Sequence, residues 1–131
     1  MANIHITVGS VDDLDYLHDQ IELNGSVVWP VPKDARVGED ILFLIPSLVG
    51  DICAIGNVIS KPVKSVKWKP KYETKIDKVV FLKEPIPIEE LIEKFPDAEY
   101  FTYARSLYTV PIEMADKLKE MIKEAMVKEA M

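Results

Sequence analysis

Apolar and polar residues alternate over residues 3–8, and this period of two predicts a half-buried β-strand. His5 falls on the polar side of the alternation, so a surface position is expected for its imidazole. Ser10 follows the strand and has the side chain of a helix N-cap. Apolar positions then recur at helical spacing over residues 11–21, which is typical of a short amphipathic helix.

Prolines and β-forming residues dominate the middle of the chain. Residues 26–32 are apolar and contain two prolines, which hold the segment extended and exclude Trp29 from a regular helix or a central strand. After a polar loop, the apolar runs 41–45 and 52–59 predict a buried hairpin at the centre of a sheet. Gly56, inside the second run, indicates a bulge or the close approach of another backbone.

The last part of the chain returns to helices. Extended structure over residues 76–83 ends at prolines, and helical spacing over residues 88–95 predicts a short helix. An aromatic-rich irregular segment then leads to Pro111, which opens the last helix. This order of elements indicates an α+β fold in which helices flank a small twisted β-barrel of about five to six strands. The 131 residues are interpreted as one domain spanning 1–131.

Basic residues gather in one segment of an acidic chain. The net charge is −6, yet residues 61–78 hold seven of the sixteen basic residues and only two acidic ones. Trp68 and Tyr72 lie among these lysines. Lysines interleaved with aromatic rings suit a phosphate backbone together with an unstacked base. The alternative is an ordinary solvated loop with one tryptophan packed into the core.

The sequence contains no motif of catalysis or metal binding. Cys53 is the only cysteine, which excludes an internal disulfide and a zinc site built on paired thiolates, and its apolar neighbours indicate a core position. His5 and His18 have no metal-ligand spacing, and no Gly-rich phosphate loop or nucleophile elbow occurs. We therefore interpret the chain as a binding module rather than an enzyme, with no cofactor and no metal. No apolar run approaches membrane-spanning length, so a cytoplasmic location without membrane contact is expected.

Several short motifs resemble those of EVE and YTH domains, which are members of the PUA-like superfamily. The run at residues 28–33, Val-Trp-Pro-Val-Pro-Lys, is similar to the Val-Trp-x-Val-Pro-Lys run of EVE proteins. Residues 36–43 resemble their Val-x-x-Gly-Asp-x-Leu motif, with Glu39 inserted between the glycine and the aspartate. Residues 52–62 are similar to a strand of the same family, and residues 104–107 to the Arg-bearing turn of the YTH branch. The resemblance covers nearly the whole chain.

The resemblance implies a PUA-like barrel that holds a modified base flipped out of its strand. In the YTH branch two tryptophans enclose a methylated adenine, and EVE members are associated with modified bases, including methylated cytosine. Trp29 falls where the first tryptophan lies, and Trp68 falls near the second, a place that Tyr72 could also take. Ser10 and the backbone near Val31 are the expected contacts to the base edge. The expected phosphate-binding residues are Arg105, Lys61, Lys64, Lys67, Lys69 and Lys71.

Two functions of different classes follow from this interpretation. The first is a non-catalytic reader of a methylated base, with single-stranded or flipped-base DNA or RNA as its partner. The second is a protein-interaction or small-ligand module that keeps the PUA-like fold without nucleic-acid function. At the residue level, Trp29 could instead plug one end of the sheet, and Trp68 could be a core residue. Arg105 could pair with Asp97 or Glu99 in place of a phosphate.

Overall fold

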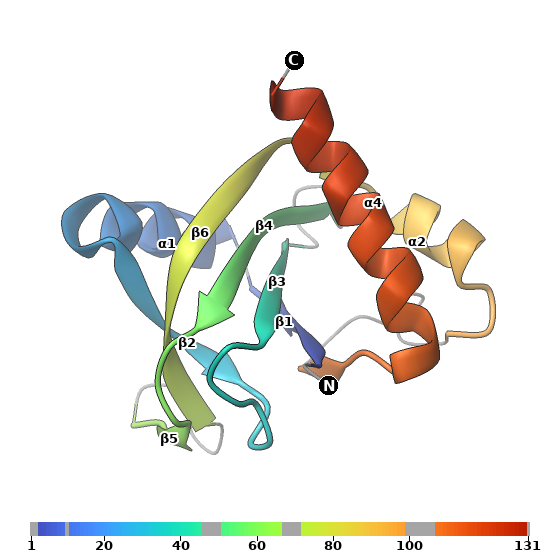
Figure 1. The fold of residues 1–131 in the computed structure, drawn as a ribbon. Coiled ribbons are helices and arrows are strands. Elements are labelled where there is room, and N and C mark those ends of the chain that lie inside the picture. Colours follow the sequence, from blue (N-terminus) through green and yellow to red (C-terminus); the bar gives the residue numbers. More distant parts are fainter. Residues whose placement is uncertain (1–2, 10, 46–50, 67–71, 99–106, 131) are drawn as a thin grey trace.

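The computed structural model describes residues 3–9, 11–45, 51–66, 72–98 and 107–130, and Figure 1 shows how their elements are arranged. Seven strands and three helices lie within these ranges. In chain order they are β1 (Ile4–Val8), α1 (Val11–Asn24), β2 (Ser26–Val31), β3 (Asp40–Ile45), β4 (Asp51–Val58), β5 (Val63–Lys64), β6 (Tyr72–Ile86), α2 (Ile88–Lys94), β7 (Tyr108–Thr109) and α4 (Ile112–Ala130).

The strands form one curled mixed sheet in the order β2-β6-β4-β3-β1-β7, with β5 beside β6 (Figure 1). β1 runs parallel to β3, and the other neighbouring strands described are antiparallel. The fifteen-residue strand β6 joins the sheet together, because β2, β4 and β5 all pair with it. The small twisted barrel predicted from the sequence is confirmed, with seven strands in place of about five to six.

Both faces of the sheet are covered by helices. On one face α4 and α2 pack over an apolar layer that includes Leu42 and Leu44. On the inner face of the curl, α1 packs over a second layer that includes Ile41, Phe43 and Ile45. Consecutive residues of the central strand β3 therefore point into different cores, as the alternation of side chains along a strand requires. No described helix combines the length and apolar character needed to cross a membrane.

The indole of Trp29 fills the inside of the curl, where the edge strand β2 comes close to β1. Its Nε1–H donates a 2.7 Å hydrogen bond to the hydroxyl of Thr7, on β1. The ring of Phe43 meets the indole edge-on at 5.1 Å between centroids, and that of Tyr16 stacks at 6.3 Å. Trp29 is only 1% exposed. Side-chain contacts, rather than a further pair of strands, thus join β2 to β1 in the described part of the chain.

Several local predictions are confirmed. The hairpin of β3 and β4 lies near the middle of the sheet, and Trp29 lies on an edge strand, where prolines are tolerated. At Gly56 the register with β6 shifts, and an added Cβ would lie 2.5 Å from the Cγ2 atom of Ile76. Cys53 is buried, as its apolar neighbours indicated.

Two predictions are corrected, one about the burial of His5 and one about where β6 begins. The surface position expected for His5 is wrong, because its side chain is fully buried. β1 pairs in parallel with β3, and strands paired in this way are usually covered on both faces. β6 begins at Tyr72 rather than at residue 76, because both β2 and β5 pair with its first residues.

We predict that Thr7→Val lowers the free energy of unfolding by about 1–3 kcal/mol, because the buried indole N–H loses this acceptor while the packing volume hardly changes. Urea unfolding of the wild type, Thr7→Val, Trp29→Phe and the double variant measures the effect. In the Trp29→Phe background the Thr7 substitution should cost much less. An equal cost in both backgrounds would contradict the hydrogen bond as the cause.

Candidate functional site

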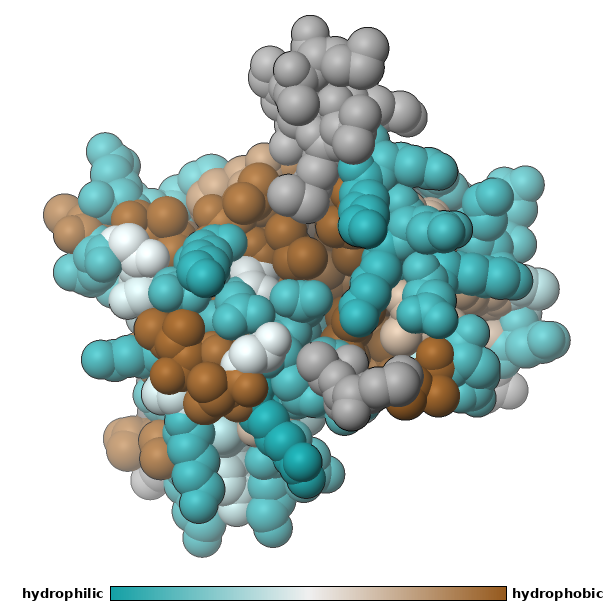
Figure 2. All heavy atoms as spheres, viewed as in Figure 1, coloured by the Kyte–Doolittle hydropathy of each residue, from teal (hydrophilic) through white to brown (hydrophobic). Residues whose placement is uncertain are grey.

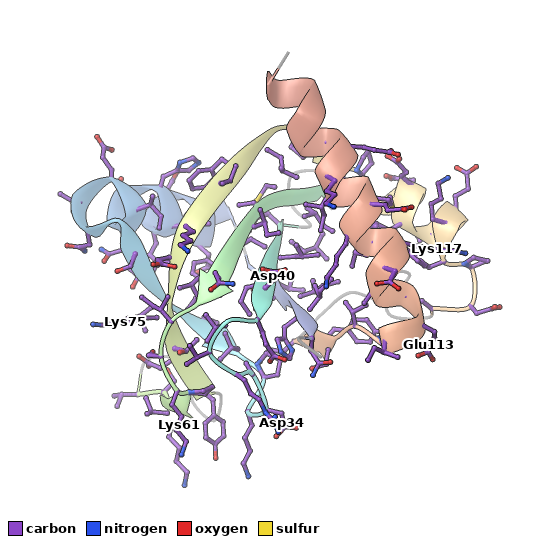
Figure 3. The ribbon with its side chains drawn as sticks, viewed as in Figure 1. Asp34, Asp40, Lys61, Lys75, Glu113 and Lys117 are labelled. Carbon is purple, nitrogen blue, oxygen red and sulfur yellow. The ribbon has the colours of Figure 1, made fainter. Side chains whose placement is uncertain are left out.

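The loop after β2 and the segment after β4 form a hollow that we call the basic pocket. Its volume is about 510 Å³, and it is lined by Lys33, Asp34, Ala35, Arg36, Val37, Lys61 and Pro62. Figure 3 labels Asp34 and Lys61 at the lower end of the molecule. In the same view, Figure 2 shows mostly hydrophilic side chains at this end. Three cations and a single carboxylate make the lining locally positive in a protein of negative net charge.

Tyr72 places an aromatic ring beside the basic pocket. It is paired with Val31 across β2 and β6, so it continues the inner column of side chains that contains Trp29. The ring is half-buried, and the ammonium group of Lys33 lies 5.9 Å from its centroid, within the range of a cation–π contact. On the other side of β6, β5 pairs Lys64 with Tyr72. The start of β6 therefore gathers an aromatic ring and lysines from two other segments.

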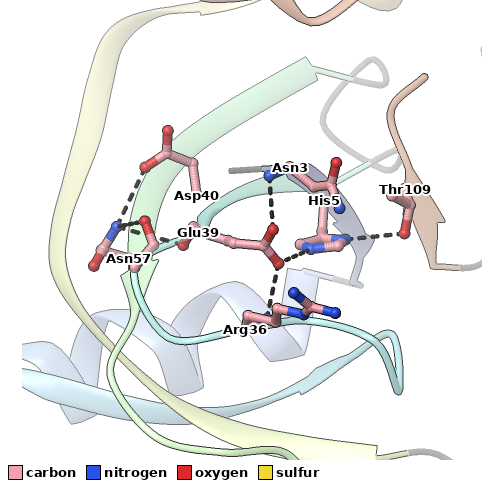
Figure 4. Close-up of polar contacts among 8 residues, drawn as sticks. Asn3, His5, Arg36, Glu39, Asp40, Asn57 and Thr109 are labelled. Atoms are coloured by element: carbon pink, nitrogen blue, oxygen red, sulfur yellow. Dashed lines mark hydrogen bonds and ion pairs between the residues drawn. The ribbon is translucent and has the colours of Figure 1, made fainter. Parts of the chain in front are cut away.

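A buried carboxylate holds the loop that carries this pocket (Figure 4). Glu39 accepts a 2.8 Å hydrogen bond from the backbone N–H of Arg36 and a 2.7 Å hydrogen bond from the backbone N–H of Asn3. Its own N–H donates to the Arg36 carbonyl, and the neighbouring Gly38 N–H donates to the Val58 carbonyl. Glu39 thereby ties the pocket loop to the start of β1.

His5 extends this polar cluster to the last strand. Its Nε2 lies 2.8 Å from a carboxylate oxygen of Glu39, and its Nδ1 lies 2.9 Å from the hydroxyl of Thr109 on β7. Because an ionised carboxylate can only accept, Nε2 carries the hydrogen and donates it to Glu39. The pair is almost fully buried, with side-chain exposures of 0% for His5 and 5% for Glu39. Glu39 stood out in the sequence because it interrupts a motif. Its pairing with His5 did not, because the two residues are 34 positions apart.

The pKa of Glu39 is lowered by the groups around it. Burial alone would raise the pKa, but hydrogen bonds from His5 and from the backbone of Asn3 and Arg36 outweigh burial. The carboxylate is therefore held in its ionised form in the folded protein. Its stabilising contribution is complete above the ordinary pKa of 4.5 and is lost as the pH falls through the lowered value.

The structure places the predicted site residues in two groups. Trp29 and Val31 lie inside the barrel, where they are 1% and 0% exposed. This position fits the alternative in which Trp29 plugs one end of the sheet. Tyr72, Lys61 and Lys64 lie at the end of the barrel with the basic pocket. The remaining predicted residues lie outside the described ranges: Ser10, Lys67, Trp68, Lys69, Lys71 and Arg105.

Sequence reasoning gave no role to two cations of the pocket, Lys33 and Arg36. Both lie in a loop of mixed charge, next to Asp34, and so lack the dense positive signal of the lysine-rich segment. The signal that could have found them is their place at the end of the Trp29 run and just after it, in the polar loop between the extended segment 26–32 and the predicted strand 41–45.

Solved structures share this architecture. A hypothetical protein from Leishmania major matches with a TM-score of 0.73 and 12% identity, over 95% of this chain and 96% of that chain. The DUF55 domain of human thymocyte nuclear protein 1 matches with a TM-score of 0.66 and 11% identity, over 90% and 97%. The Mmi1 YTH domain matches with a TM-score of 0.58 and 12% identity, over 97% and 99%. The chain has the PUA-like fold of EVE and YTH domains.

The PUA-like fold agrees with the short motifs in the sequence, although no protein-family model and no curated protein matches the chain. Glu39, which interrupts the motif that residues 36–43 resemble, supplies the buried carboxylate that joins the pocket loop to β1.

We predict that Glu39→Gln lowers the free energy of unfolding by about 2 kcal/mol at pH 7, because the amide replaces charge-assisted hydrogen bonds. Unfolding is measured from pH 7 to pH 3. The difference from the wild type should shrink as the pH falls from 4.5 toward the lowered native pKa, because the carboxylate of the unfolded chain takes up a proton before that of the folded protein does. The control is Glu89→Gln, which removes the same charge from an exposed position on α2. A Glu39→Gln deficit that stays constant over this pH range would contradict the account.

Proposed function

We propose that the chain is a non-catalytic nucleic-acid-binding module that reads a modified, methylated base, with a cytoplasmic location. The observation that carries the proposal is the basic pocket beside the ring of Tyr72, on a barrel like those of the DUF55 and YTH domains. The resemblance of the short sequence motifs to YTH domains implies a methylated base as the ligand. The same combination of cations and an aromatic ring suits single-stranded DNA or RNA.

Lysines around the pocket supply attraction to the phosphate backbone. Lys61 lines the pocket and Lys64 lies beside Tyr72. Each lysine that neutralises a phosphate releases condensed counterions, so affinity should fall as salt rises. Because the chain as a whole is acidic, a short single strand fits this patch better than a duplex that wraps the protein. The proposed phosphate contacts also include Lys67, Lys69, Lys71 and Arg105.

Base recognition is assigned to Trp29, inside the barrel, together with Trp68 or Tyr72. Extruding a base costs a few kcal/mol, and stacking on an aromatic side chain returns about 1–3 kcal/mol per base. Two faces, from Trp29 and either Trp68 or Tyr72, can therefore offset the extrusion. Ser10 and the backbone at Val31 are proposed to hydrogen-bond the base edge.

Access to Trp29 requires a local rearrangement, since the indole is covered in the structure. The Tyr16 ring stacks on it, while the half-buried Gly9 lies against its edge, where an added Cβ would be 3.2 Å from the Cζ2 atom of Trp29. We propose that a base approaches past Gly9, displacing Tyr16, and meets Ser10 as the next residue along the chain.

Selectivity for a methyl group should be modest. One buried methyl contributes roughly 0.8 kcal/mol, which corresponds to a preference of about four-fold. A larger preference would require polar contacts that distinguish the modified base edge.

A second candidate function is the binding of a small anionic ligand without nucleic acid. The basic pocket favours it, because a volume of about 510 Å³ is typical of ligand sites and its lining combines cations with Val37, which is 63% exposed. The two functions can be told apart by nucleic-acid binding. A site for a small ligand would show no affinity for single-stranded nucleic acid that depends on its bases.

The test is a titration of the protein with labelled single-stranded DNA and RNA, each with and without one methylated base, at low salt. We predict binding that weakens steeply as salt rises and a preference of about four-fold or more for one methylated strand. Equal and negligible affinity for every strand would remove the nucleic-acid proposal.

Matched variants locate the base contact. Tyr72→Ala removes the ring and should weaken binding about ten-fold, whereas Tyr72→Phe keeps the stacking face and should bind nearly as well as the wild type. Trp68→Ala should lose the preference for the methylated base if the second face is Trp68. Unchanged affinity and preference in both alanine variants would contradict the proposed cage.

A further inference from the structure

We infer that the basic pocket is a phosphate subsite of the nucleic-acid interface, formed by Lys33 and Arg36 together with Lys61. This inference rests on the proposed function and extends it, because it brings the loop between β2 and β3 into the contact with the strand. The subsite would hold the phosphate of a nucleotide next to the one that stacks on an aromatic ring.

The charges of the three cations are not neutralised by any carboxylate in the described part of the chain. Among the residues that the structure describes, none of the three has a carboxylate oxygen within 4.0 Å of its side-chain nitrogens, whereas His5 and Glu39 do form such a pair. All three side chains are exposed at a concave surface. Like charges that converge on a hollow repel one another, so the arrangement gains free energy when an anion enters.

The fold holds the pocket in place. The backbone at Arg36 is fixed through two hydrogen bonds with Glu39, and the Ala35 N–H donates to the Pro32 carbonyl at 3.0 Å. Lys33 is oriented by the Tyr72 ring beneath it. A loop that is already ordered loses little conformational freedom on binding, which favours affinity.

The pocket lies next to the other residues of the proposed interface. Lys33 contacts Tyr72, and Tyr72 pairs with Lys64 across the β5–β6 ladder. The basic pocket is thus continuous with Tyr72 and Lys64, which the proposed function assigns to nucleic-acid binding. A guanidinium, as in Arg36, is well suited to two oxygens of one phosphate.

The experiment measures the affinity of the full chain for a labelled single-stranded oligonucleotide at several salt concentrations. The variants are Lys33→Ala, Arg36→Ala and Arg36→Lys. The matched control is Lys117→Ala, an exposed lysine on α4 that Figure 3 labels away from Asp34 and Lys61. Strands with and without a 5′-phosphate distinguish a terminal phosphate from an internal one.

Each alanine variant should weaken binding about ten-fold and reduce the salt slope by about 0.7, the value for one phosphate of a single strand. Arg36→Lys should lie between Arg36→Ala and the wild type, because it keeps the charge but not the paired donors. Affinity and slope equal to those of Lys117→Ala would overturn the subsite while leaving the proposed function intact. A wild type that binds no strand would overturn the proposed function, and the subsite with it.

Discussion

The structure depends on the contact between Trp29 and Thr7, which brings an edge strand of the curled sheet to the strand near its other end. β2 contains Pro30, which lacks an N–H, and an edge position is where a strand tolerates this loss. The indole therefore completes the inner core that a ladder of backbone hydrogen bonds does not close. The same contact accounts for the burial of Trp29, so its packing role in the free protein and its proposed role toward a base compete for one ring.

A second constraint governs the surface above this core. The ionised Glu39 is buried with His5, and it fixes the loop that carries Lys33 and Arg36. A buried carboxylate is unfavourable unless its oxygens accept hydrogen bonds, and here both oxygens do. The hydrogen bonds of the cluster offset the cost of burying the carboxylate and fix the loop, and this loop places Lys33 and Arg36 at one end of the barrel.

Much of the fold was predictable because it follows from local patterns, such as the two apolar runs that form β3 and β4 and the prolines beside Trp29. His5 was misplaced because alternation cannot separate a polar side chain facing water from one that faces a buried carboxylate. The same limit applies to Trp29, since an extended segment with prolines suits both a plug and a platform. The pocket was missed because Lys33 and Arg36 meet Lys61 only after the sheet has curled.

The most direct test of the account is an NMR titration of the ¹⁵N-labelled protein with a short single-stranded oligonucleotide. The account predicts the largest shifts at the amides of Lys33, Arg36, Lys61 and Tyr72, a change in the Trp29 indole N–H signal, and unchanged signals along α4. Shifts confined to the helices α2 and α4, or no shifts at any strand concentration, would contradict it.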